Sequence, residues 1–173
     1  MSIEKIKKAI REVPDYPKPG ILFYDITPIL QDPELYNCVT ELIAKKYKNN
    51  MPDKVIGIES RGFIFGMPLA YDLNLGFVPV RKKGKLPADT YEVSYDLEYG
   101  SATIEIHKDA LKKGDKVIIV DDLLATGGTA AAAVELAEKC GAEVLGIEFV
   151  IELSFLNGRE KLKNCNINSL IIY

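Results

Sequence analysis

The sequence predicts an α/β fold with a mostly parallel central sheet flanked by helices. Short apolar segments alternate with amphipathic segments from residue 55 onwards, a pattern typical of strand–helix–strand units. Within this pattern, residues 117–120 are four consecutive β-branched residues, which indicates a buried strand. Ligands of such sheets bind beyond the carboxyl ends of the strands, where we expect Glu59, Arg81 and Asp121 to emerge.

The N-terminal region is expected to hold two helices joined by a constrained loop. Residues 2–13 place apolar side chains on one helical face, and Pro14 ends that helix. Residues 14–30 contain four prolines and one glycine, which predicts a loop without regular structure. Asp32 and Pro33 then provide an N-cap and a first helical residue for a helix that reaches about Lys48.

The remaining elements alternate along the chain. The expected strands are 55–59, 77–81, 101–107, 117–121, 144–153 and 169–173. The expected helices are 62–73 and 129–139, the latter stopped by Gly141, with single helical turns at 109–113 and 157–162. Residues 82–100 are polar and basic without a clear period, so they are expected to be irregular.

Composition limits the classes of protein to consider. A chain of 173 residues is most simply one domain, and 47% apolar with 27% charged residues is typical of a globular protein. The net charge of −3 gives no general attraction to nucleic acid or an anionic membrane, so we expect neither as a partner. Cys38, Cys140 and Cys165 show no disulfide or metal spacing, and no signal peptide or membrane span is visible. We therefore expect a cytoplasmic protein.

The most informative stretch is residues 117–129. Two carboxylates follow the predicted strand, and a glycine-rich loop with hydroxyl groups leads into a helix. Backbone N–H groups at the start of a helix are unpaired and partially positive, so they favour an anion. The carboxylates would repel a phosphate and instead suit sugar hydroxyls or a magnesium-bound group. We expect the loop to bind a phosphate and an adjoining sugar through Asp121, Asp122, Ala125, Thr126, Gly127, Gly128 and Thr129.

Other phosphate-binding patterns fit this stretch less well. The Gly-Lys-Ser/Thr ending of a Walker loop is absent, and so is a Gly-x-Gly-x-x-Gly fingerprint. A Val-Asp-Asp strand end also occurs in response-regulator receivers, but near the start of the domain. Here about two thirds of the chain precedes it.

Two further segments carry cations suited to a polyanion. Arg61 follows a predicted strand at the start of a helix, and its planar guanidinium can bind two oxygens of a pyrophosphate at once. Taken alone, Arg61 is more typical of a surface ion pair, and its place opposite the phosphate-binding stretch favours the ligand role. Residues 81–85 hold four cations, which form either a solvated charge run or a site for an anionic leaving group. The long stretch after them suggests a lid that excludes water.

Residues 14–28 form a proline-rich loop that carries Leu22, Phe23 and Tyr24. These side chains can stack on a flat heterocycle, and the backbone can bind its edge. The same residues can also serve to plug the core, and spacing alone does not separate the two.

The phosphate-binding stretch closely resembles the phosphoribosyl-pyrophosphate (PRPP) motif of the type I phosphoribosyltransferases. Together with residues 17–23, 60–63, 81–87, 97–100 and 158–162, it resembles the adenine phosphoribosyltransferase family from Pro14 to about Leu162. Two positions depart from the family pattern. Tyr16 stands where the family has Phe, and Tyr24 stands where it often has Arg.

This resemblance implies a purine salvage enzyme, a transferase that moves the 5-phosphoribosyl group from PRPP to adenine and yields AMP and pyrophosphate. It implies Mg²⁺ bound mainly through the substrate, with no direct protein ligand, and a homodimer. It also implies one type I phosphoribosyltransferase domain, residues 1–173, with a small hood at about 14–30 and a flexible lid at about 82–100.

The resemblance also implies roles for individual residues. Backbone groups around Leu22 and Tyr24 would bind the edge of adenine, and Phe23 would pack on its ring. Glu98 and Arg61 would be catalytic, with Glu98 exchanging a proton with the purine. The expected pyrophosphate-binding residues are Ser60, Arg61, Lys82 and Lys85.

Two alternatives remain open from the sequence. A phosphoribosyltransferase for a 6-oxopurine would share the motifs, because discrimination depends on backbone donors and acceptors that the sequence does not show. A non-catalytic PRPP-sensing regulator would share the ligand-binding loop but would call for a separate DNA-binding unit and a basic face. A structural or assembly protein would have no need for the acidic pair and phosphate loop.

Overall fold

The computed structural model describes residues 2–96 and 100–173. The larger sheet is built from β3 (Lys54–Ile58), β4 (Gly76–Lys82), β5 (Thr90–Asp96), β6 (Ser101–His107), β7 (Lys116–Leu124), β8 (Glu143–Glu152) and β9 (Ile167–Ile172). The helices are α1 (Ile3–Ala9), α2 (Thr27–Gln31), α3 (Pro33–Tyr47), α4 (Arg61–Asp72) and α5 (Gly128–Lys139). Two short 3₁₀ helices, η1 (Ser154–Leu156) and η2 (Gly158–Leu162), follow β8.

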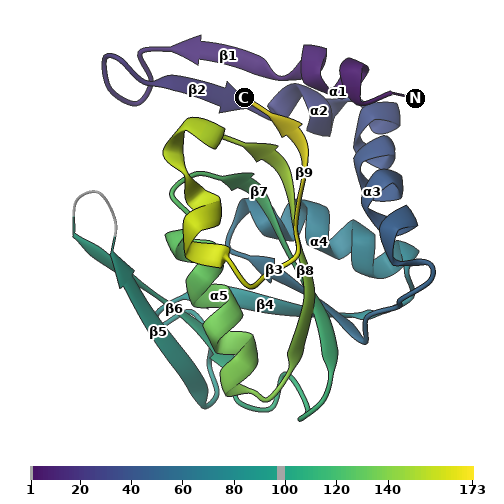
Figure 1. Ribbon diagram of the computed structural model, residues 1–173, viewed down its shortest axis with the longest axis vertical. Helices are drawn as coiled ribbons and strands as arrows, with labels where there is room; N and C mark the ends of the chain where they lie inside the picture. Colours follow the sequence, from purple (N-terminus) through teal and green to yellow (C-terminus); the bar gives the residue numbers. More distant parts are fainter. Residues whose placement is uncertain (1, 97–99) are drawn as a thin grey trace.

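The strands of the larger sheet are ordered β5-β6-β4-β3-β7-β8-β9 (Figure 1). Strands β4, β3, β7, β8 and β9 pair in parallel, while β5 and β6 form an antiparallel hairpin at the edge beside β4. This confirms the predicted α/β class and its mostly parallel sheet. Within the described residues, the helices are too short or too polar to cross a bilayer.

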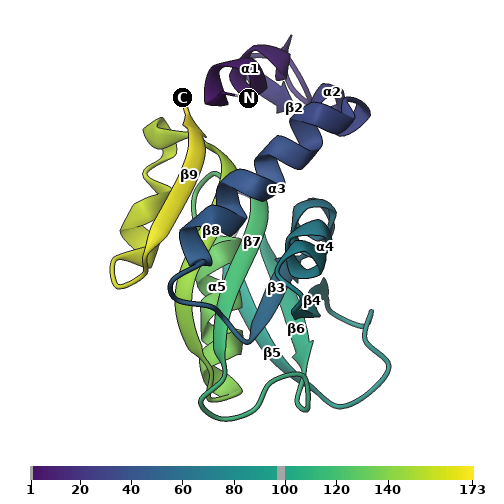
Figure 2. The ribbon, with the colours of Figure 1, turned by 90° about the vertical axis from the view of Figure 1, so that its right-hand side faces the viewer.

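Helices cover both faces of the sheet, with α5 on one face and α3 and α4 on the other (Figure 2). The apolar run of β7 serves both layers. Val117 and Ile119 pack toward α5, whereas Ile118 and Val120 pack toward α3 and α4. Since alternate residues of a strand face opposite sides, a strand buried on both faces has a continuous apolar run instead of an alternating one.

The N-terminal region differs from the prediction because of strand pairing. The expected helix 2–13 ends at Ala9, and β1 (Arg11–Pro14) pairs antiparallel with β2 (Leu22–Asp25) in a separate two-stranded sheet. The loop 14–30 therefore contains β2 and the start of α2, although it was expected to be irregular. This two-stranded hood lies above the carboxyl ends of the central strands (Figure 1).

The predicted helix that starts after Asp32 is confirmed as α3. The Asp32 carboxylate accepts hydrogen bonds from the backbone N–H groups of Glu34 and Leu35, as an N-cap does. Two other expectations were wrong. Residues 90–96 form β5, paired with β6, and 109–113 form turns and bends in place of a helical turn. Part of the segment expected to be an irregular lid is therefore a regular strand.

Candidate active site

The phosphate loop (residues 125–129) begins where β7 ends and leads into α5. Gly127 is the N-cap of α5 with φ 78°, a left-handed conformation that favours glycine. The loop, Asp121 and Phe149 contribute to the lining of a cavity of about 70 Å³. Because α5 starts at this cavity, its unpaired backbone N–H groups are available to an anion.

Asp121 and Asp122 lie within β7, which continues to Leu124 because it pairs with β8 that far. The predicted strand end at Asp121 was therefore too early. Asp121 lines the phosphate-loop cavity, and its Oδ1 accepts a hydrogen bond of 2.9 Å from the backbone N–H of Asp122. Burial raises the pKa of both carboxyls. The charge of Asp122 raises the pKa of Asp121 further, whereas Arg61 partly opposes the rise at Asp122.

Arg61 connects this acidic pair to the rest of the site. Its Nε lies 3.0 Å from Asp122 Oδ2, a buried oxygen that has no hydrogen-bond partner among the described residues. A Cβ on the next residue, Gly62, would lie 2.6 Å from the carbonyl oxygen of Val120. Glycine at position 62 therefore lets the start of α4 approach β7 closely enough for the Arg61–Asp122 pair to form.

Glu59 organises the neighbouring basic segment. Its Oε2 accepts a hydrogen bond of 2.9 Å from the backbone N–H of Lys82 and lies 3.3 Å from Arg81 Nε. Burial opposes ionisation of Glu59, but the bonds from Lys82 and Arg81 outweigh it and lower its pKa. Arg81 is thus engaged with Glu59, and Lys82 is held beside the strand end that leads to Ser60 and Arg61.

Glu105 supports the other side of this basic turn. Its buried Oε1 accepts hydrogen bonds from the backbone N–H groups of Lys85 and Leu86, at 2.9 and 2.8 Å. The backbone of the turn is thereby tied to the sheet while the Lys82 and Lys85 side chains stay exposed. Ser60 is also exposed, at the N-cap of α4.

A second cavity, of about 490 Å³, lies between the hood and α4. Its lining includes Val13, Tyr16, Phe23, Asp25, Ile26, Thr27, Leu30, Arg61 and Ile64. The Arg61 guanidinium carbon lies 5.7 Å from the centre of the Phe23 ring, so the hood and the start of α4 meet here. Leu22 is 41% exposed, whereas the Tyr24 side chain is buried and packs against Tyr173. The backbone roles of Leu22 and Tyr24 stay a prediction.

Two residues of the site were missed by sequence reasoning. Asp25 lines the hood cavity, and its Oδ1 accepts hydrogen bonds from the backbone N–H and hydroxyl of Thr27, a local Asp-x-Thr pattern that the sequence displays. Tyr95 of β5 accepts a hydrogen bond of 3.1 Å from the Thr129 hydroxyl. Glu98, the predicted proton-exchange group, lies outside the described residues.

Comparison with known proteins identifies the family. A family model described as "Phosphoribosyl transferase domain" matches residues 25–165. Adenine phosphoribosyltransferase of Carboxydothermus hydrogenoformans is 59% identical over 168 residues, which cover 97% of this chain and 99% of that protein.

Solved structures of the same kind of enzyme match the fold. The adenine phosphoribosyltransferase of Thermoanaerobacter pseudethanolicus superimposes with a TM-score of 0.96 at 53% identity, over 99% of this chain and 100% of that one. The Saccharomyces cerevisiae enzyme, in complex with adenine and an imino-altritol bisphosphate, matches with a TM-score of 0.93 at 45% identity, over 97% of each chain. Because the family model and these relatives cover most of the sequence, the chain belongs to the adenine phosphoribosyltransferase family.

Proposed function

We propose that the chain transfers the 5-phosphoribosyl group of PRPP to adenine and releases pyrophosphate and AMP, a purine salvage reaction. The observation that carries the proposal is the series of neighbouring groups that runs from Asp121, which lines the phosphate-loop cavity, through Asp122 and Arg61 to Phe23. These neighbours can take the 5′-phosphate, the ribose and, on either side of the reacting C1′ carbon, the leaving pyrophosphate and the entering base. The family membership and the adenine bound to the yeast relative support adenine as the acceptor.

The phosphate loop and the acidic pair hold the phosphoribosyl group. Backbone N–H groups of residues 125–129 and the hydroxyls of Thr126 and Thr129 bind the 5′-phosphate. Asp121 and Asp122 accept hydrogen bonds from the ribose hydroxyls. Positive charge develops on the sugar as the bond to pyrophosphate breaks, and these two carboxylates stabilise it.

The cations hold the leaving group. Arg61 binds pyrophosphate through its planar guanidinium while Asp122 orients it, and the exposed Ser60, Lys82 and Lys85 side chains complete the site. The hood positions the base, with Phe23 on its ring and the backbone of Leu22 and Tyr24 at its edge. The N9–C1′ bond forms as the C1′–oxygen bond breaks, and the Glu98 carboxylate accepts the proton that adenine releases.

Mg²⁺ would be held in this site mainly through the substrate. Within residues 2–96 and 100–173, no three His, Cys, Asp or Glu side chains gather to form a metal site. The buried Asp122 Oδ2 without a hydrogen bond is suited to a ribose hydroxyl or to a water of the cation. When bound, Mg²⁺ would neutralise part of the pyrophosphate charge.

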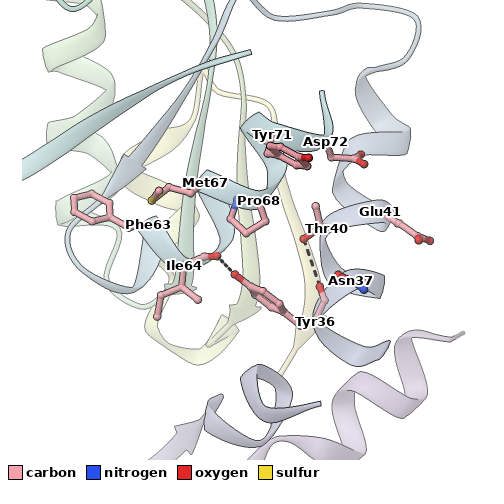
Figure 3. A pocket seen from close by; sticks show the side chains of 10 residues that line it. All are labelled: Tyr36, Asn37, Thr40, Glu41, Phe63, Ile64, Met67, Pro68, Tyr71 and Asp72. Atoms are coloured by element: carbon pink, nitrogen blue, oxygen red, sulfur yellow. Dashed lines mark hydrogen bonds between the residues drawn. The ribbon is translucent and has the colours of Figure 1, made fainter. Parts of the chain in front are cut away.

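The proposed enzyme is a homodimer that uses the α3–α4 face. Tyr36 of α3 and Phe63, Met67 and Tyr71 of α4 contribute to the lining of a cavity of about 580 Å³ (Figure 3). Met67 is 57% exposed and Tyr71 is 90% exposed. An exposed apolar surface of this kind suits a protein partner.

Two further features favour a second copy of the chain as that partner. Glu41 and Asp72 give the surface an acidic rim that suits the exposed lysines of the 82–85 turn of the other copy. Helix α4, which contributes Phe63, Met67 and Tyr71 to this surface, starts at Arg61, so the partner would lie beside the pyrophosphate site.

The three free cysteines, Cys38, Cys140 and Cys165, favour the reducing cytoplasm as the location of the protein.

In the first experiment, the purified protein is incubated with PRPP, Mg²⁺ and one base at a time: adenine, hypoxanthine, guanine or xanthine. The products are then resolved by chromatography. We expect AMP and an equal amount of pyrophosphate from adenine alone. Asp122→Asn serves as a matched variant, which should bind PRPP more weakly in calorimetry.

The outcomes separate the alternatives. Nucleotide from a 6-oxopurine would keep the reaction type but contradict adenine as the base. PRPP binding without a nucleotide product from any base would support the regulator instead. Unchanged PRPP binding by Asp122→Asn would remove Asp122 from the ribose site.

A further inference from the structure

The phosphate loop rests on the backbone of a segment that is distant in sequence, at the start of η2. A Cβ on Gly158 would collide with the carbonyl oxygen of Ala125, and a Cβ on Gly127 would collide with the carbonyl oxygen of Gly158. The two backbones therefore touch directly, without an intervening side chain. Any movement of Gly158 would move the loop or open a gap beneath it.

The residue after Gly158 anchors this segment to the sheet. Arg159 Nε donates to Glu152 Oε1 at 2.6 Å, and Arg159 Nη2 donates to Glu152 Oε2 at 2.7 Å. The Ser169 hydroxyl donates to the same Oε2 at 2.6 Å, and Arg159 Nη1 donates to the carbonyl oxygen of Ile167 at 3.3 Å. Two strands, β8 and β9, thus hold one guanidinium through a two-bond fork and a third contact.

Glu152 is well suited to this role. It is the last residue of β8 and only 4% exposed. The hydrogen bonds that Glu152 accepts from Arg159 and Ser169 outweigh the effect of burial and lower the pKa of Glu152. The Glu152–Arg159 pair is therefore ionised at neutral pH. The next residue, Leu153, donates its backbone N–H to the carbonyl oxygen of Leu124 at 2.9 Å. The end of β8 therefore holds the beginning of the phosphate loop as well.

We propose that Arg159 is a positioning residue for the 5′-phosphate, acting through Gly158 on the phosphate loop. This rests on the proposed function, in which the loop binds the 5′-phosphate of PRPP. Donors from different residues of a loop bind one phosphate well only when their mutual geometry is set in advance. The Glu152–Arg159 pair sets it from outside the loop, with no contact to the substrate.

The test compares Arg159→Gln, which removes the guanidinium, with Lys163→Gln, which removes one exposed charge from the same segment. Calorimetry gives the Kd for PRPP with Mg²⁺, and steady-state kinetics gives the KM for adenine and kcat. We expect Arg159→Gln to raise the Kd for PRPP on the order of tenfold, less than the roughly 100-fold that a 1 Å misplacement can cost. The KM for adenine should change by less than about twofold, and Lys163→Gln should resemble the parent protein.

Two milder variants keep the test decisive if Arg159→Gln does not fold. Arg159→Lys keeps the charge but cannot form both hydrogen bonds to the Glu152 carboxylate, and Ser169→Ala removes one hydrogen bond to Glu152. Both should weaken PRPP binding without an equal effect on adenine. Equal effects on both substrates, or PRPP binding unchanged in all three variants, would overturn the proposal. A parent protein that binds no PRPP would contradict the proposed function itself.

Discussion

The ring of Tyr24 stacks on the ring of Tyr173, with centroids 4.0 Å apart and 29° between the ring planes. Tyr24 belongs to β2 of the hood, and Tyr173 directly follows β9 of the central sheet. Lys7 of α1 adds a cation 5.0 Å from the centre of the Tyr173 ring. The Tyr24 side chain therefore fastens the hood to the sheet, at the position where the family often has Arg.

Tyr173→Ala should loosen the hood and raise the KM for adenine several-fold, with the Kd for PRPP unchanged. Aromatic pairs contribute about 0.5–1.5 kcal/mol beyond the area they bury, so the melting temperature should fall as well. Tyr24→Phe keeps the stacked ring and is the matched control. A KM for adenine that rises equally in Tyr24→Phe would show that the hydroxyl matters more than the stack.

Asp121→Asn should bind PRPP more weakly and yet be more stable than the parent at pH 7. Burial and the neighbouring Asp122 raise the pKa of Asp121 well above its usual value. Between the usual and the raised value the folded state binds more protons than the unfolded state, so stability falls as pH rises through that window. Each 1 kcal/mol that the variant gains in stability would raise its melting temperature by about 2–4 °C. This difference from the parent should vanish toward pH of about 4 and below, where Asp121 is protonated in both the folded and the unfolded state.

Asp115→Asn is the control, for which the opposite change in stability is expected. A hydrogen bond from the backbone N–H of Lys112, helped by Lys54, lowers the pKa of Asp115. Its ionised form therefore stabilises the fold above the usual Asp pKa, and the variant should lose stability at pH 7. If both variants shift the melting temperature in the same direction at pH 7, the assigned electrostatics of Asp121 is wrong.

Gly62→Ala should destabilise the protein by about 1–3 kcal/mol, the usual effect of forcing atoms into a packed site. The new Cβ would lie 2.6 Å from the Val120 carbonyl oxygen and would push Arg61 away from Asp122. Gly76→Ala is the control, since the nearest atom to its Cβ would be 3.7 Å away. Urea unfolding measures both, and equal stability of the two variants would contradict the close approach.

Met67→Glu should convert a dimer into a monomer, because it places a charge in the apolar α3–α4 surface. Met51→Glu is the control, since Met51 is similarly exposed at 47% but lies before β3. Size-exclusion chromatography with light scattering gives the masses. A monomeric parent protein, or a dimer that survives Met67→Glu, would show that this face is not the interface.

Glu98→Gln should lower kcat more than it weakens PRPP binding, because the amide cannot exchange the proton of the purine. Glu92→Gln, on β5, is the control and loses only a surface pair with Lys83. Steady-state kinetics and PRPP calorimetry are the measurements. An unchanged kcat would remove Glu98 from the chemistry.

Local patterns were enough to predict the parts of the site that are continuous in sequence. The β-branched run of β7, the glycine loop and α5 follow one another, so their order alone predicts a phosphate-binding corner. The N-cap at Asp32 was equally predictable, because a capping bond joins residues two or three positions apart.

Elements that depend on distant partners were predicted less well. Residues 11–13 continue the helical period of α1 but belong to β1, because they pair with β2. Residues 90–96 were predicted to be irregular, as part of a polar stretch, but form β5, because β6 pairs with them and α5 packs against them. β7 continues to Leu124 because β8 extends beside it.

The sequence by itself therefore determined the α/β class, the phosphate loop and the residue types available to the substrate. Only the tertiary structure decided which of them meet. Arg61 pairs with Asp122, Tyr24 turns from the hood cavity to Tyr173, and Gly158 supports the loop at Gly127. Each of these contacts joins residues far apart in the chain. Their formation depends on the packing of the whole sheet and its helices, which a local pattern of residues does not specify.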